Sequence, residues 1–257
     1  MEYGFIKEYW ENQAKQYQDS HSASWGDIYM INLEIQNIGR FISVGDAVFD
    51  VGCGNGYSTF QLLDKGVKLI KGIDFSENMI RQANIRKSEM NLGDIISFDV
   101  GDIRDLKFED ALFDVVYTTR VLINLPSWEE QRKGIDECLR VTKPGGKVLF
   151  SEAFWEPLVL LNSLRALKQL SPLVEHDFNR YLKKKWLEDF FMSKNLTFEN
   201  IDFSSIYYLG SRFLRELVTD IDQYPGYSNP INEIFYKIEQ EYSGGNFGIQ
   251  QIYVISK

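Results

Sequence analysis

Cysteine and histidine are scarce in this chain, and their scarcity argues against several kinds of chemistry. The 257 residues include two cysteines, Cys53 and Cys138, and two histidines. Two cysteines cannot supply a four-ligand metal site, and these two are too far apart for a C-x-x-C pair. We therefore expect no metal centre, and we expect a reduced, cytoplasmic protein.

The sequence also lacks long apolar runs and a basic surface. The apolar stretch at 158–161 is far shorter than the roughly 20 residues that cross a bilayer, and the first ten residues have no apolar core of a signal peptide. The formal net charge is −9, and the only dense basic run is Lys183–Lys185. Proteins that bind nucleic acid through its phosphates normally carry a basic face. These features predict neither membrane insertion nor a nucleic-acid partner.

Short apolar segments alternate with helical ones through the middle of the chain. Strands are expected at 47–51, 68–73, 95–100, 113–118 and 147–151. Ser76 and Ser127 stand where helix N-caps are expected, and Gly66 stands where a helix should end. Such alternation is typical of a parallel sheet covered on both faces, whose ligands bind past the carboxyl ends of the strands. Ligand-binding residues are therefore expected directly after each strand.

A glycine-rich turn, Asp50-Val51-Gly52-Cys53-Gly54-Asn55-Gly56, follows the first strand. Glycines let the backbone approach a ligand, and the helix behind them offers unpaired N–H groups to an anionic group. The spacing is G-x-G-x-G, and Tyr57 occupies the position that would complete the dinucleotide pattern G-x-G-x-x-G. An NAD(P)-dependent oxidoreductase stays an alternative, but this spacing counts against it. A Walker-type NTPase is disfavoured because no P-loop lysine follows the turn.

Acidic residues follow the next two strands. Asp74 ends the second strand about 20 residues beyond the turn, where a carboxylate can accept hydrogen bonds from ribose hydroxyls. Asp102 follows the third strand with the apolar Ile103 beside it, a combination that suits the amine and the face of an adenine ring. The pattern predicts a nucleoside-type ligand at the strand ends.

The segments VFDVGCGNGYST, GIDFSENMI, VGDIRDL, FDVVYTT and LRVTKPGGKVLFSE resemble the ordered motifs of the class I S-adenosylmethionine (SAM)-dependent methyltransferases. The resemblance covers roughly residues 47–152 and implies SAM as cofactor, with S-adenosylhomocysteine as product. It implies that the glycine turn holds the methionine part, Asp74 the ribose and Asp102 with Ile103 the adenine. The cofactor-binding residues that we predict are Asp50, Gly52, Cys53, Gly54, Gly56, Asp74, Phe75, Asp102, Ile103 and Thr119.

The resemblance also implies an α/β, Rossmann-like fold with a mostly parallel seven-stranded sheet, helices on both faces and a helical cap. A terminal antiparallel hairpin is expected from 201–208 and 247–256, with a long helical insertion between them. The Lys143–Gly146 segment resembles the family's turn into strand five. We expect an N-terminal helical lid at 1–40, a SAM-binding core at 41–152, and the rest of the sheet with an inserted acceptor-binding cap at 153–257.

The acceptor side is less defined. Where nucleobase and glutamine N-methyltransferases often carry an Asn/Asp-Pro-Pro-aromatic tetrad, this chain reads Thr118-Thr119-Arg120-Val121, which disfavours that type of amino-group methylation. A hydroxyl acceptor needs a base, for which His176 and Glu152 are candidates, and Arg120 is a candidate for binding an anionic group. His21 is a candidate member of the N-terminal lid.

A looser resemblance of 120–125 and 151–182 to methyltransferases from bacterial surface-polysaccharide clusters points to an oxygen acceptor. That acceptor would be a sugar, nucleotide-sugar or phosphoryl group in capsule or surface-polysaccharide biosynthesis. N-methylation of an amino sugar or another small amine is an alternative, and a non-catalytic SAM-binding protein is a second. Either way, we expect a monomer or a homodimer with a small-molecule partner.

Overall fold

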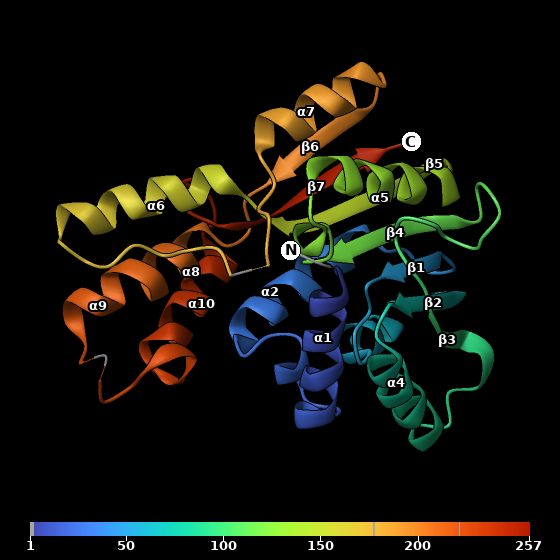
Figure 1. Cartoon of the computed structure of the whole chain (residues 1–257), viewed down its shortest axis with the longest axis horizontal. Coiled ribbons are helices and arrows are strands. Elements are labelled where there is room, and N and C mark those ends of the chain that lie inside the picture. The colour runs from blue at the N-terminus through green and yellow to red at the C-terminus, as the bar shows by residue number, and fades with distance from the viewer. Residues whose placement is uncertain (1–2, 177, 221) are drawn as a thin grey trace.

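The computed structural model describes residues 3–176, 178–220 and 222–257, and its centre is one mixed β-sheet. The strand order is β3-β2-β1-β4-β5-β7-β6, in which β7 runs antiparallel to both β5 and β6 while the remaining pairs are parallel (Figure 1). The strands are β1 (Ala47–Val51), β2 (Leu69–Asp74), β3 (Ile96–Val100), β4 (Phe113–Thr119), β5 (Thr142–Ala153), β6 (Thr197–Ile201) and β7 (Gln250–Ser256). This topology confirms the predicted fold class.

Helices cover both faces of the sheet, and short polar caps define several of their ends. Ser76 and Ser127 each accept a hydrogen bond from the backbone N–H three residues on, at 3.2 and 3.3 Å, as their N-cap positions predicted. The helices are α1 (Tyr3–Tyr17), α2 (Ile28–Ile38), α3 (Tyr57–Gln61), α4 (Glu77–Glu89), α5 (Trp128–Val141), α6 (Trp155–Leu167), α7 (Lys184–Ser193), α8 (Ser205–Leu209), α9 (Arg215–Val218) and α10 (Ile231–Glu241), with the single-turn helices η1 (His21–Ala23) and η5 (Leu122–Asn124) among the shorter elements.

The hydrophobic core lies in two layers, one on each face of the sheet. Val48 of β1 packs into the layer that contains residues of α2, α3 and α4, whereas its neighbours Phe49 and Val51 pack into the layer that contains residues of α5 and α7. Side chains of a strand alternate between faces, so a strand buried on both sides is apolar throughout. Figure 1 shows α5 and α7 on one side of the sheet and α2 and α4 on the other.

Two of the predicted boundaries are wrong. The hairpin strand is Thr197–Ile201, and the segment predicted as a strand at 201–208 instead forms α8. Glu239 of α10 accepts a hydrogen bond from the Tyr207 N–H at 2.8 Å, so a distant residue satisfies the start of this helix. The predicted turn at Lys143–Gly146 lies within β5, which begins at Thr142 and shifts its register against β4 there.

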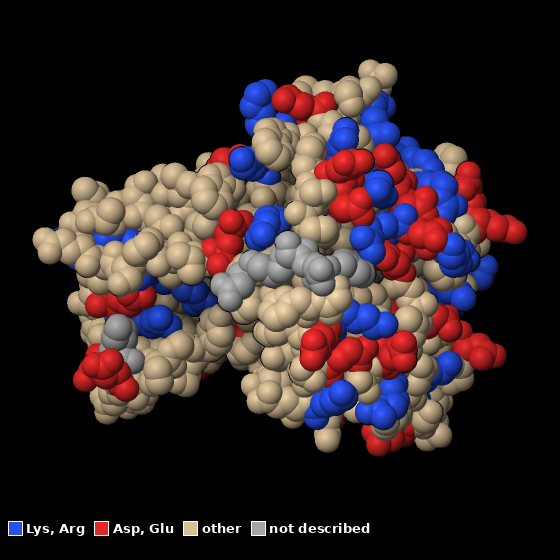
Figure 2. Space-filling model, in the orientation of Figure 1, with Lys and Arg blue, Asp and Glu red and all other residues tan. Residues whose placement is uncertain are grey.

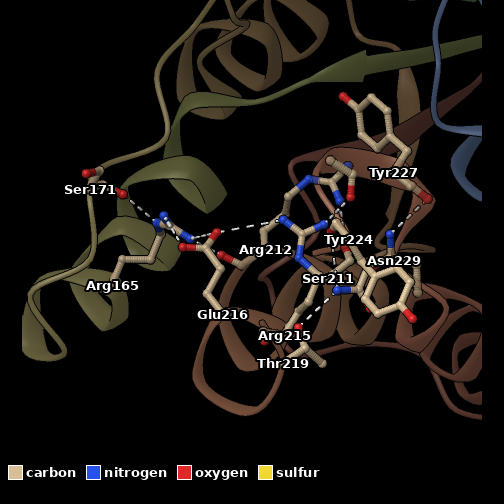
Figure 3. Close-up of polar contacts among 12 residues, drawn as sticks. Arg165, Ser171, Ser211, Arg212, Arg215, Glu216, Thr219, Tyr224, Tyr227 and Asn229 are labelled. Carbon is tan, nitrogen blue, oxygen red and sulfur yellow. Dashed lines mark hydrogen bonds and ion pairs between the residues drawn. The ribbon is translucent and has the colours of Figure 1, made fainter. Parts of the chain in front are cut away.

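The cap consists of α6, α8, α9 and α10 and lies beside the carboxyl end of the sheet (Figure 1). Arg165 of α6 ties it together, because its guanidinium donates to the Ser171 carbonyl at 2.8 Å and to both carboxylate oxygens of Glu216 at 2.9 and 3.0 Å (Figure 3). The same group donates to the carbonyl of Arg212. One buried side chain therefore fixes three segments of the cap. Among the described residues, no helix is both long and apolar enough to span a bilayer.

Candidate active site

A cleft opens where the first strands end and the N-terminal helix crosses them. It contains about 930 Å³ of empty space, with open solvent at its mouth included. Its walls come from α1, the glycine turn, the ends of β2 and β4, and η5. The lining residues are Ile6, Trp10, Ser24, Asp50, Val51, Gly52, Cys53, Gly54, Asn55, Tyr57, Ser58, Ile73, Asp74, Phe75, Met79, Gly101, Ile103, Thr119, Arg120, Val121, Asn124 and Leu125.

The glycine turn needs its glycines for conformation and for space. Gly52, Gly54 and Gly56 have φ values of +86°, +54° and +77°, in a region that L side chains rarely adopt. A Cβ on Gly52 would lie 2.1 Å from Cγ2 of Val121, so the turn could not pack against the segment after β4. The bare backbone therefore forms the floor of the cleft.

Asp50 is buried behind the cleft wall. Its Oδ2 accepts a hydrogen bond from the Thr59 hydroxyl at 2.6 Å, while its enclosed Oδ1 has no partner of good hydrogen-bond geometry among the described residues. Burial raises the pKa of Asp50 to about 7, although the Tyr117 hydroxyl lies near enough to act in the opposite direction. A buried carboxylate oxygen without a donor fits a ligand that brings one, such as the ammonium group of the methionine part of SAM.

Asp74 joins the two loops that frame the cleft. Its carboxylate accepts the N–H of Gly54 at 3.0 Å and that of Ser76 at 2.9 Å. Carboxylate oxygens have lone pairs beyond these two bonds, so the group can still accept from ribose hydroxyls. Burial raises its pKa to about 6, although the backbone N–H bonds act in the opposite direction.

Most of the other predicted cofactor residues also line the cleft, but Gly56 and Asp102 do not. Cys53, Phe75, Ile103 and Thr119 are on its walls. Asp102 is not among the lining residues, and its carboxylate instead accepts hydrogen bonds from Arg104, with contacts between 2.5 and 3.1 Å. Its contact with adenine stays a prediction.

Arg120 lines the cleft in an unusual conformation. Its φ is +58°, which is rare for a residue with a side chain and costs free energy unless its surroundings fix it. Here the Arg120 N–H donates to the Ser151 carbonyl at 2.9 Å, and the guanidinium pairs with the buried Glu34 of α2. Burial lowers the pKa of Arg120 to about 10, so the group stays cationic at neutral pH.

Glu152 lies beneath the cleft and is completely buried. Its carboxylate accepts the Thr118 hydroxyl at 2.7 Å and the N–H groups of Val121, Leu122 and Ile123 at 3.1 to 3.3 Å. Burial raises its pKa to about 7. It is not among the lining residues, and its contacts hold η5 in place, so the role of base stays a prediction that this placement does not favour.

Neither histidine lies on the cleft wall. His176 is exposed and packs on Phe178 with ring centroids 4.5 Å apart; Phe178 in turn contacts Trp10, which lines the cleft. His176 lines a separate groove beside α6. His21 packs against Tyr57 at 5.6 Å between centroids, at the edge of the cleft. Their predicted roles remain untested.

The sequence reasoning missed the residues that close the cleft from the N-terminal side. Ile6 and Trp10 of α1 form part of its wall. Asn55 of the glycine turn donates to the carbonyls of Gln18 and Ser20, both at 2.8 Å, and Glu11 of α1 accepts the N–H of Glu77 at the start of α4 at 2.8 Å. The amphipathic, aromatic-rich start of the chain was a signal for a lid, but it did not identify these partners.

The strand order, the glycine turn after β1 and the carboxylate at the end of β2 together define the class I methyltransferase fold. Residues 49–150 match the family described as "Methyltransferase domain", and this segment belongs to it. The assignment confirms the family resemblance, and with it SAM as the cofactor of the family.

Relatives with known names match about half of the chain. The chain is 30% identical over 117 residues to the 27-O-demethylrifamycin SV methyltransferase of Amycolatopsis mediterranei, covering 45% of this chain and 42% of that protein. It is 32% identical over 139 residues to the demethylmenaquinone methyltransferase of Clavibacter sepedonicus, covering 54% and 49%. The chain thus spans about half the length of these relatives.

Solved structures match over nearly the whole chain. The geranyl diphosphate C-methyltransferase of Streptomyces coelicolor A3(2) superposes with a TM-score of 0.62 at 13% identity, covering 99% of this chain and 97% of that one. A chain in the complex of the Haloferax volcanii Trm112 methyltransferase activator with a methyltransferase gives 0.64 at 21% identity, covering 96% of each. At these identities the match shows the shared fold.

Proposed function

We propose that this protein is a SAM-dependent methyltransferase that acts on a small molecule. The observation that carries the proposal is the convergence of the unpartnered Asp50 oxygen, the left-handed glycine turn and the Asp74 carboxylate in one cleft. The family match of residues 49–150 and the named relatives support it.

SAM supplies a methyl group on a positively charged sulfur, so that transfer forms the bond from acceptor to carbon as the carbon–sulfur bond breaks. The chain has to hold the reactants in line and keep water out. Asp50 and the glycine turn would bind the methionine part, and Asp74 would bind the ribose. Trp10 of α1 would cover the cleft, and Arg120 would face the acceptor.

We propose that the methylated atom of the acceptor is an oxygen. A named relative that methylates oxygen supports it, as does the absence of the Asn/Asp-Pro-Pro-aromatic tetrad after β4. A sugar, nucleotide-sugar or phosphoryl acceptor in surface-polysaccharide biosynthesis remains part of the proposal on the loose sequence resemblance alone. N-methylation and a non-catalytic SAM-binding role are the alternatives. The buried arginines of the cap favour an enzyme with an acceptor site.

Calorimetry with SAM, S-adenosylhomocysteine and NAD tests the cofactor. We expect both SAM and its product to bind and NAD not to bind. Asp74→Ala should weaken SAM by about 100-fold, because the ribose diol loses charge-assisted hydrogen bonds worth a few kcal/mol. Unchanged SAM affinity in Asp74→Ala would refute the assignment of that residue, and no SAM binding in the wild type would refute the proposal.

Transfer of a labelled methyl group from SAM into a small-molecule extract tests catalysis. Label in a small product, together with released S-adenosylhomocysteine, would support the enzyme. SAM binding without any transfer across extracts would favour the non-catalytic alternative.

A further inference from the structure

Two arginines, two tyrosines and one tryptophan form a chain of contacts from the cleft into the cap. The Arg120 guanidinium lies 4.8 Å from the ring of Trp25, whose indole N–H donates to the Tyr227 hydroxyl at 3.0 Å. Arg212 lies 5.0 Å from the Tyr227 ring and 5.4 Å from the Tyr208 ring. Figure 3 shows Arg212 and Tyr227 on neighbouring parts of the cap. We call Arg120, Trp25, Tyr208, Arg212 and Tyr227 the arginine–tyrosine cluster.

The carboxylates that adjoin this cluster are already occupied. Asp27 is buried; it accepts the Tyr207 hydroxyl at 2.7 Å and the Met30 N–H at 3.3 Å, and it pairs with Arg212. Glu34 accepts the Ser151 hydroxyl at 2.9 Å and a Gln250 amide at 3.2 Å besides pairing with Arg120. These acceptors therefore have little capacity left for further donors.

Donors of the cluster, by contrast, are unused. Within the described ranges, the Tyr208 hydroxyl has no hydrogen-bond partner, although the residue is only 5% exposed. The Nε of Arg212 and the Nε and Nη2 of Arg120 also have none, since their ion pairs use other nitrogens. None of these atoms is fully enclosed by protein. Because they are not enclosed, these donors are accessible to a ligand that offers several acceptor atoms.

We propose that the arginine–tyrosine cluster is the acceptor subsite, and that it binds an oxyanion group, carboxylate or phosphate, of the small molecule to be methylated. Tyr208 and Arg212 hold this group, and the methyl-accepting atom extends past Arg120 into the cofactor cleft. The inference rests on the proposed function and narrows its substrate class to anionic molecules. Each arginine of the cluster is paired with one buried carboxylate, so the oxyanion would be held by the remaining N–H and O–H donors and not by an excess of positive charge.

The protonation states agree with this geometry. Burial raises the pKa of the Tyr208 hydroxyl well above its ordinary value, so the group remains a donor at neutral pH. Burial lowers the pKa of Arg212, but the nearby Asp27 carboxylate and the tyrosines raise it beyond its ordinary value, so the guanidinium stays charged. Both groups therefore donate hydrogen bonds across the physiological pH range.

The test uses the full chain saturated with S-adenosylhomocysteine. Saturation-transfer NMR and calorimetry measure the affinity of small probes for it. Phenyl phosphate and benzoate carry the two oxyanions, and phenol and benzamide are their neutral counterparts. We expect at least one oxyanion probe to bind about tenfold tighter than its neutral counterpart, as hydrogen bonds to charged groups predict. Which of the two binds better identifies the group.

Two variants test whether the probe binds at the cluster. Tyr208→Phe removes only the unpartnered hydroxyl and should weaken the oxyanion probe about tenfold while leaving S-adenosylhomocysteine affinity unchanged. Arg212→Gln should weaken it further, but that change also leaves the buried Asp27 without its cation. The matched controls are Tyr242→Phe, at a residue 71% exposed, and Lys185→Gln, whose side chain is 80% exposed; both should bind the probe as the wild type does.

The inference is overturned if oxyanion probes bind no better than neutral ones at about 10 mM, where even weak fragments register. It is equally overturned if Tyr208→Phe binds them as the wild type does. Either result, with S-adenosylhomocysteine still bound, would leave the proposed function standing. If the wild type does not bind S-adenosylhomocysteine, the proposed function itself is refuted.

Discussion

The sheet region and the cap distribute their charges in opposite ways. Charged side chains crowd the surface over the sheet and its helices, whereas the cap shows a largely uncharged surface in the same view (Figure 2). Large apolar side chains of the cap are exposed, among them Leu167 at 79% and Val218 at 67%. Its arginines lie inside, with Arg165 at 3% and Arg215 at 8% exposed. Both regions have an apolar core, but the cap adds a network of buried arginines that joins distant segments.

This contrast separates two ways of building a site. In the sheet region, backbone N–H groups and strand-end carboxylates make the cofactor cleft, and the partners are local or one strand apart. In the cap, side chains from distant segments satisfy one another, as Arg165 does with Glu216. A buried polar network of this kind stabilises the fold only while every member keeps its hydrogen-bond partners.

The largest effect is expected at the base of the sheet region, for Glu152→Ala. The variant leaves three N–H groups at 121–123, two of them buried, without their acceptor, and each such loss in a buried position costs about 1–3 kcal/mol. We expect the free energy of unfolding to fall by about 4 kcal/mol. Urea denaturation measures it.

Glu199→Ala is the matched control, because Glu199 is exposed on β6 and its loss should be within about 0.5 kcal/mol. A Glu152→Ala protein that is as stable as the wild type but inactive would contradict the positioning role and restore Glu152 as a candidate base.

The same contrast explains what could be predicted from the sequence. The glycine turn, Asp74 and the alternation of strands with helices were predictable because each depends on neighbouring residues and a short period, whereas the seven-stranded sheet followed from the family resemblance. The cap was not, because its interactions join residues far apart: Arg212 pairs with Asp27, 185 positions away. For the same reason α8 was mistaken for a strand, since the contact that starts it comes from Glu239. Likewise, sequence could not show that Glu152 faces backbone N–H groups.

Arg165→Ala tests whether the stability of the cap and the binding of SAM in the sheet region are independent. Removing the guanidinium leaves Glu216 without its main partner, and breaking a buried ion pair costs about 3–5 kcal/mol, somewhat less here because Glu216 is 14% exposed. We expect α6 and α9 to lose protection from hydrogen exchange while SAM affinity stays near that of the wild type. A parallel loss of SAM affinity would show that the cap and the cofactor cleft are coupled, against the division drawn above.

A smaller effect concerns pH and the cofactor. Burial raises the pKa of Asp50 from 3.8 to about 7, and an ionised Asp50 is what the SAM ammonium needs. SAM affinity should therefore rise several-fold from pH 6 to pH 7.5 in calorimetry, by linkage of binding to proton release. Asp50→Asn should abolish most of this dependence, and an unchanged slope in that variant would assign it elsewhere.

Asp50 should affect the stability of the unliganded protein in the opposite sense. Because its pKa is higher in the folded state than the ordinary 3.8, its contribution to stability is fully present below about pH 4 and is lost as the pH rises through about 7. The difference in unfolding free energy between the wild type and Asp50→Asn, followed across this range, isolates that contribution from the other carboxylates.

The smallest effect is expected for His176→Ala. The residue is exposed, and Phe178 and Trp10 stand between it and the cleft, so its loss should change methyl transfer by less than about twofold. Rates measured over a range of acceptor concentrations, with Tyr208→Phe beside it, make the comparison sharp, because the cluster variant should raise the KM for the acceptor and the histidine variant should not. A large loss of turnover in His176→Ala at normal SAM affinity would return the histidine to the mechanism. It would also require the 170–180 segment to move toward the cofactor when the acceptor binds.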